Sequence, residues 1–213
     1  MEMEIVEFDV ELSHGLIKHI HKLPQAIQVK ILKNIKLWAE RLKKFKGKKR
    51  AKYFYTQIDQ AVSDDLASFK IKENLPISCK KGCSHCCHMN IDVFKDEAIL
   101  LAGKIKSGEI SYNKAEFDAQ KNMSAADFQN NPKPCIFLKD SQCSIYKYRP
   151  ATCRKYFVVG DPNDCIIGDK PIIVANPALY NAEIIYTGMS RASPFHANSS
   201  LPYMLDQALQ KRI

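Results

Sequence analysis

The stretch Cys79-Lys80-Lys81-Gly82-Cys83-Ser84-His85-Cys86-Cys87-His88 decides how the rest of the chain is organised, because it holds four of the eight cysteines within nine residues. Residues 1–78 contain no cysteine. The remaining cysteines occur singly, at Cys135, Cys143, Cys153 and Cys165. We therefore expect the chemistry of the chain to reside in a cluster of thiolates that assembles in its second half, and we interpret this cluster as a metal or iron–sulfur site.

The composition is that of an ordinary globular protein of 213 residues, of which 46% are apolar and 26% charged. This length fits one medium domain, or a small domain with a helical extension. We find no run of about 20 apolar residues, so no membrane span is expected. The acidic start, Met1–Glu7, lacks the features of a secretory signal. We expect a cytoplasmic location, where thiols stay reduced and eight cysteines favour metal binding over disulfides.

The formal net charge of +9 is weak evidence for a nucleic-acid partner, because metal-bound thiolates add negative charge that the formal count omits. The basic run Lys43–Arg50 is better evidence. However, lysines favour the C-terminal end of a helix, and Phe45 alone offers too little aromatic surface for base stacking. We expect this run to be a solvated helix end, so nucleic acid is a partner that the sequence allows but does not favour.

Two amphipathic helices are predicted in the cysteine-free half. Apolar residues recur at spacings of three and four over Pro24–Lys46, and Gly47 would end this helix. A second apolar stripe predicts a helix over Tyr53–Lys70. We expect the two helices to form an antiparallel hairpin that packs on the cysteine-rich part or on a second copy. The same helices could offer a surface to a protein partner.

The second half is predicted to combine short helices with one β-hairpin. Two apolar runs, 135–138 and 143–146, flank a polar turn at 139–142, and this pattern is typical of a hairpin with Cys135 and Cys143 near its open ends. Helices are predicted over 95–105, 111–128, 177–189 and 202–212, with a short helix from Pro150, an extended link at 91–94 and a short strand at 172–174.

The expected fold class is therefore mainly α with a small β-hairpin. A helical extension over residues 1–75 would precede an irregular cysteine-rich metal-binding domain over residues 76–168. Residues 169–213 would supply a strand and helices that pack on this domain.

The spacing of the clustered cysteines suits soft metal ions. Thiolates select zinc, copper(I) and iron–sulfur clusters over hard ions, and Cys83-x2-Cys86 is the kind of knuckle that begins many zinc sites. Cys86 and Cys87 are adjacent and project differently, so both are poorly placed to bind one ion. Either Cys87 lies just outside the ligand set, or the site holds more than one metal atom, as in an iron–sulfur cluster or a pair of zinc ions.

Other interpretations of the cysteines remain open. They could be buried structural thiols, or a redox switch in which Lys80 and Lys81 make neighbouring thiols reactive. His85 and His88 could be ligands or could hydrogen-bond to ligands. Cys165 has the least support, because it stands alone in a turn-rich segment.

Five pieces of sequence together resemble the YkgJ-type cysteine-cluster family, a mainly bacterial family described as a zinc- or iron-chelating domain. The resemblance covers residues 76–168 and rests on matching motifs in order. They are Cys79-x3-Cys83-x2-Cys86-Cys87, Pro134-Cys135-Ile136-Phe137-Leu138, Cys143-Ser144-Ile145-Tyr146, Arg149-Pro150 and Cys153-Arg154. One departure is Gln142, where the family often has glycine.

The resemblance implies a ligand set and supporting residues. It implies metal ligation by Cys79, Cys83, Cys86, Cys87, Cys135, Cys143 and Cys153, with Cys165 as a trailing cysteine. It also implies that Arg149 and Arg154 lie beside the thiolates, where guanidinium groups would offset negative charge. Tyr146 and Tyr148 would pack over the site.

Three functions follow from these observations. The first is a cytoplasmic protein that holds zinc or iron for a structural, storage or redox role. The second is an iron–sulfur enzyme, because flagellin lysine methylases have a similar cysteine pattern; His85, His88 and Asp161 are candidate acid–base residues, but nothing pairs them, and catalytic residues stay unassigned. The third is an interaction module that zinc merely stabilises.

Overall fold

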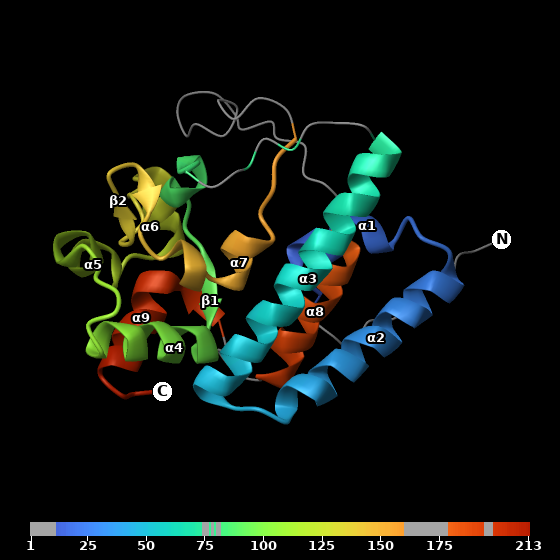
Figure 1. Cartoon of the computed structure of the whole chain (residues 1–213), viewed down its shortest axis with the longest axis horizontal. Coiled ribbons are helices and arrows are strands. Elements are labelled where there is room, and N and C mark those ends of the chain that lie inside the picture. The colour runs from blue at the N-terminus through green and yellow to red at the C-terminus, as the bar shows by residue number, and fades with distance from the viewer. Residues whose placement is uncertain (1–11, 74–76, 78, 80–81, 160–178, 194–197) are drawn as a thin grey trace.

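The computed structural model describes residues 12–73, 77, 79, 82–159, 179–193 and 198–213. The fold is mainly α-helical with small antiparallel sheets, which confirms the predicted fold class. In Figure 1 the long N-terminal helices lie on one side of the molecule, and the short helices, small sheets and cysteine-bearing segments lie on the other. Within the described residues, no helix is both long enough and apolar enough to cross a membrane.

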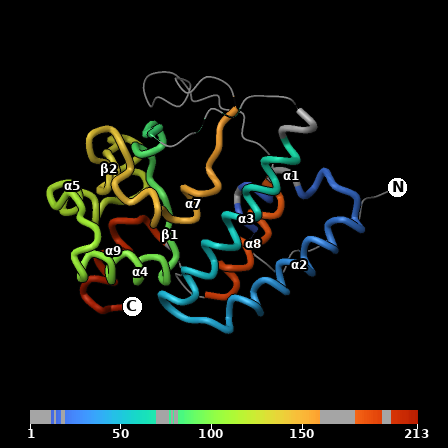
Figure 2. Tube along the Cα trace, in the orientation of Figure 1, coloured from blue at the N-terminus to red at the C-terminus, as the bar shows by residue number. Residues whose placement is uncertain are grey.

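The helical side is built from three N-terminal helices and one from near the C-terminus. The first three follow each other along the chain, and their bounds are α1 (His14–Ile20), α2 (Gln25–Lys43) and α3 (Gly47–Glu73). Helix α8 (Tyr180–Ala192) packs against both α2 and α3, as the tube in Figure 2 also shows. The predicted helices α2 and α3 are present, but α2 packs mainly on α8, and α3 packs on both α8 and α4 (Lys95–Lys106), so the two do not pair mainly with each other.

The other side is organised around a short sheet and the helices that follow its strands. Strand β1 (Asp92–Phe94) pairs antiparallel with β4 (Asn198–Ser200), with Val93 opposite Ser199. Each strand leads directly into a helix, and α4 and α9 pack on each other. The bounds of the helices on this side are α4 (Lys95–Lys106), α5 (Lys114–Gln120), α6 (Ala125–Asn130), α7 (Ala151–Arg154) and α9 (Leu201–Leu209).

The predicted cysteine hairpin is present, with shorter strands than expected. Strand β2 (Leu138–Lys139) pairs with β3 (Gln142–Cys143), so Leu138 lies opposite Cys143. Asp140 and Ser141 form the turn, with φ angles of 49° and 56°. Such left-handed residues match the twist of a two-residue hairpin. The expected four-residue turn is therefore wrong, and Gln142 lies in a strand, where no glycine is required.

Three other expectations are corrected. Gly47 does not end a helix but begins α3, where its φ of 53° turns the chain after α2. The helix expected over 111–128 is two helices, because Ser124 caps α6 by accepting a hydrogen bond from the Asp127 N–H. Strand β4 was not expected. The strand expected at 172–174 lies outside the described residues.

Arg50 also departs from the expected solvated helix end. It is only 8% exposed, and it donates hydrogen bonds to the carbonyl oxygens of Phe45 and Ala192. Its Nε lies 3.2 Å from Oδ2 of the buried Asp96. The last residue of the basic run thus ties the start of α3 to α4 and to the end of α8.

The contact between α2 and α8 depends on Gly188. A Cβ added there would lie 2.7 Å from the Cβ of Trp38 and 3.2 Å from the Ala39 nitrogen. Gly188→Ala should therefore lower the free energy of unfolding by about 1–3 kcal/mol through overpacking, measured by urea denaturation. Gly103→Ala is the matched control, because its Cβ would meet only the flexible end of Lys48. Equal behaviour of the two variants would contradict the proposed close contact.

Candidate metal centre

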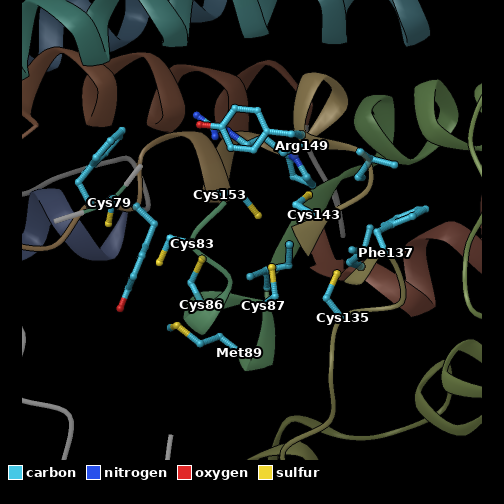
Figure 3. A pocket seen from close by; sticks show the side chains of 17 residues that line it. Cys79, Cys83, Cys86, Cys87, Met89, Cys135, Phe137, Cys143, Arg149 and Cys153 are labelled. Carbon is cyan, nitrogen blue, oxygen red and sulfur yellow. The ribbon is translucent and has the colours of Figure 1, made fainter. Parts of the chain in front are cut away.

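All seven described cysteines line one cavity of about 100 Å³, and all seven are free thiols. This volume is several times the ~10–15 Å³ that a single water molecule needs. Figure 3 shows that the labelled cysteine side chains surround a common space. They are Cys79, Cys83, Cys86, Cys87, Cys135, Cys143 and Cys153. The structure thus brings together residues far apart in sequence, whereas metal ligation by them stays a prediction.

Backbone hydrogen bonds hold the cysteine-bearing segments against each other. Cys86 and Cys87 lie in a 3₁₀ turn, η1 (His85–His88). The N–H of Cys135 donates to the carbonyl oxygen of Cys87 at 2.6 Å, which fixes the hairpin segment to this turn. After α7, the N–H of Val158 donates to the Cys79 sulfur at 3.2 Å. These bonds explain why thiols from separate segments face one cavity.

The hairpin cysteines have matching local geometry. The N–H of Phe137 donates to the Cys135 sulfur, and the N–H of Ile145 donates to the Cys143 sulfur. In both cases the donor is two residues after the cysteine. Because hydrogen bonding to a thiolate favours its charged form, this arrangement prepares both sulfurs to bind a cation.

Burial opposes ionisation of most of these thiols. It raises the pKa of Cys135 to about 11 and that of Cys153 well above its usual range. The exception is Cys86, because a hydrogen bond with the Cys87 side chain lowers its pKa to about 7. The same bond, together with burial, raises the pKa of Cys87. Without a cation, Cys86 therefore ionises more readily than Cys87, Cys135 and Cys153, whose pKa values are raised.

Arg149 is the cationic side chain on the cavity wall. Its guanidinium lies 3.9 Å from the centre of the Tyr146 ring, and its positive charge favours ionisation of Cys79, Cys86 and Cys143. The Nε of Arg149 is buried and has no hydrogen-bond partner. A buried donor without a partner requires an explanation, and an anionic thiolate–metal complex in the cavity would supply one. The donor set therefore fits zinc or iron.

The remainder of the wall is mostly apolar. Met89, Ile91 and Phe157 contribute to it, and Tyr146 lines the cavity as the resemblance implied. Tyr148 does not line it; its hydroxyl donates to Glu109 instead. Sequence reasoning missed Met89, because a single methionine gives no pattern. Apolar walls strengthen electrostatic interactions inside a site.

The other candidate residues that the structure describes lie away from the cavity wall. His85 and His88 are in η1 but do not line the cavity. Arg154 does not line it either, because its guanidinium donates to the carbonyl oxygens of Arg149 and Lys147 and to Asp59. Cys165 and Asp161 lie outside the described residues.

The thiols do not form a finished coordination shell. Among the residues that the structure describes, no three Cys, His, Asp or Glu side chains are grouped so that they could hold a metal ion as they stand. Binding an ion would therefore require the cysteine side chains to rotate or their segments to move inward.

Seven thiols around a small apolar cavity with one arginine define a thiolate site of the metal-chelating class. Residues 78–173 match the model of the CxxCxxCC family, described as "Putative zinc- or iron-chelating domain". This match bears out the resemblance found in the sequence. Comparison with curated proteins and with solved structures gave no match.

Proposed function

We propose that the protein binds zinc or iron through the cysteines of this cavity. The observation that carries the proposal is the convergence of seven free thiols from four separate segments on one cavity beside the buried, unpaired Nε of Arg149. The match of residues 78–173 to the family model supports a zinc- or iron-chelating role at the level of class. Free thiols in this number also favour a reducing location, so we propose the cytoplasm.

The number of thiols favours more than one metal atom. A tetrahedral zinc site uses four ligands, whereas seven cysteines line this cavity. The adjacent pair Cys86 and Cys87 fits a polynuclear site, because each residue can then bind a different metal atom. A bound iron–sulfur cluster would supply electron transfer, and zinc would supply cross-linking of the segments.

An enzymatic role receives less support. In the described part of the cavity wall there is no histidine, aspartate or glutamate, the side chains that most often act as general acids or bases. We therefore favour a binding or redox function over an iron–sulfur enzyme that resembles the lysine methylases.

The test is elemental analysis of protein purified without oxygen, combined with its visible spectrum. Stoichiometric iron with a brown colour indicates an iron–sulfur centre, whereas colourless protein with stoichiometric zinc indicates a zinc site. Protein that contains neither metal, and that does not take up either when they are supplied under reducing conditions, would contradict the proposal.

Metal affinity should rise steeply with pH. Cys135, with a pKa of about 11, is protonated at neutral pH, so a metal ion must displace its proton. Each proton released on binding adds about tenfold in affinity per pH unit. We expect the zinc affinity to rise more than about tenfold per unit between about pH 6 and pH 8, measured with a competing chelator. Affinity that does not change with pH would show that these thiols are not the ligands.

A further inference from the structure

Glu97 is a completely buried carboxylate close to the metal centre, with a relative exposure of 0%. It lies in the first turn of α4 and does not line the cavity. A buried carboxylate is costly unless hydrogen bonds satisfy it, so its partners show what it holds in place.

Its two oxygens accept backbone hydrogen bonds from two different segments. Oε2 accepts from the N–H of Phe94 at 2.8 Å, where β1 passes into α4. Oε1 accepts from the N–H of Ala151 at 2.8 Å, at the first residue of α7. One side chain thus links β1, which continues the segment that carries Cys86 and Cys87, to the helix that carries Cys153.

A neighbouring contact reinforces the same link. The hydroxyl of Thr152 donates to the carbonyl oxygen of Asp92 at 2.9 Å. Helix α7 has only four residues, too few to be stable alone. Its position, and with it that of Cys153, therefore depends on contacts such as these.

We infer that Glu97 is a positioning residue of the metal centre, which acts through the N–H of Ala151 to hold α7 so that the Cys153 sulfur faces the other thiols. The inference rests on the proposed function, since it assumes that Cys153 binds metal. Glu97 itself touches no metal in this account.

A merely structural carboxylate offers a matched comparison within the same chain. Asp65 is also buried, at 6% exposure, and it also accepts backbone hydrogen bonds, from the N–H groups of Asn181 and Ala182 at the start of α8. It lies in the helical side and does not line the cavity. Loss of either carboxylate should lower stability, but only loss of Glu97 should weaken metal binding.

The experiment measures zinc affinity of the full-length reduced protein with a competing chelator, and melting temperature in parallel. In Glu97→Gln the amide N–H₂ group replaces one accepting oxygen, so one of the two backbone N–H donors meets another donor. We therefore expect the zinc affinity to fall about tenfold or more. Glu97→Asp keeps the charge but is too short to reach both donors, so it should also weaken binding. Asp65→Asn should lower the melting temperature and leave the affinity unchanged.

A double-mutant cycle separates positioning from general loosening. If Glu97 acts through Cys153, Glu97→Gln should change the affinity less than about twofold in a Cys153→Ser background. An equal loss in both backgrounds, an unchanged affinity in both Glu97 variants, or a Cys153→Ser variant that binds like the wild type would overturn the inference. Failure of the wild-type protein to bind zinc or iron would instead refute the proposed function.

Discussion

Replacing Cys135 with serine should lower the metal content of the purified protein and reduce its zinc affinity more than about 100-fold. Serine would remove a soft donor atom, the proposed ligand, from the hairpin segment that Cys87 holds through its carbonyl oxygen. Because metal binding contributes directly to folding stability, the melting temperature of the metal-loaded protein should fall as well. Elemental analysis and thermal unfolding with and without a chelator measure both effects.

Ile136→Val is the control for this substitution. Ile136 is the next residue and is 1% exposed, so the smaller side chain should cost about 0.5–1.5 kcal/mol of unfolding free energy without loss of metal. If Cys135→Ser retains the wild-type metal content, or if it loses stability equally with and without the chelator, the hairpin thiol is not a ligand.

Arg154→Ala should lower the free energy of unfolding by about 3–5 kcal/mol even in the metal-free protein. Arg154 is 6% exposed, and two of its hydrogen bonds go to the carbonyl oxygens of Arg149 and Lys147. Its guanidinium also lies 4.2 Å from the centre of the Tyr55 ring. Alanine would leave the two carbonyl groups without their donor and remove the packing on Tyr55. Urea denaturation of the reduced, metal-free protein measures the loss.

The control for Arg154 is another arginine that stacks on an aromatic ring. Arg41 lies 4.8 Å from the centre of the Trp38 ring on the exposed side of α2, so Arg41→Ala should cost only about 0.5–1 kcal/mol. Similar losses for the two variants would show that Arg154 is not the link between α7 and α3 that its contacts indicate.

The sequence predicts those helices and strands whose apolar pattern lies within one short stretch of the chain. The apolar repeat before Lys46 yields α2, and the apolar runs that contain Cys135 and Cys143 yield the hairpin. The grouping of cysteines followed from their unusual spacing and from the family resemblance. In each case the residues that define the element are close together in the chain.

The features that the sequence did not reveal depend on tertiary contacts. Strand β4 is Asn198-Ser199-Ser200, which has no strand pattern and is extended because it pairs with β1. Arg154 matches a family motif that implies a place beside thiolates. In the fold, its guanidinium instead donates hydrogen bonds to backbone carbonyl oxygens and to Asp59. The role of Glu97 depends on a hydrogen bond to Ala151, 54 residues away.

Thiol labelling under native conditions tests the central claim most directly. The metal-loaded, reduced protein is treated with an alkylating reagent before and after chelation, and the label at each cysteine is mapped by mass spectrometry. Chelation should raise the reactivity of the cysteines that line the cavity, from Cys79 in the clustered stretch to Cys153 in α7. Labelling that chelation does not change at these positions would contradict that claim.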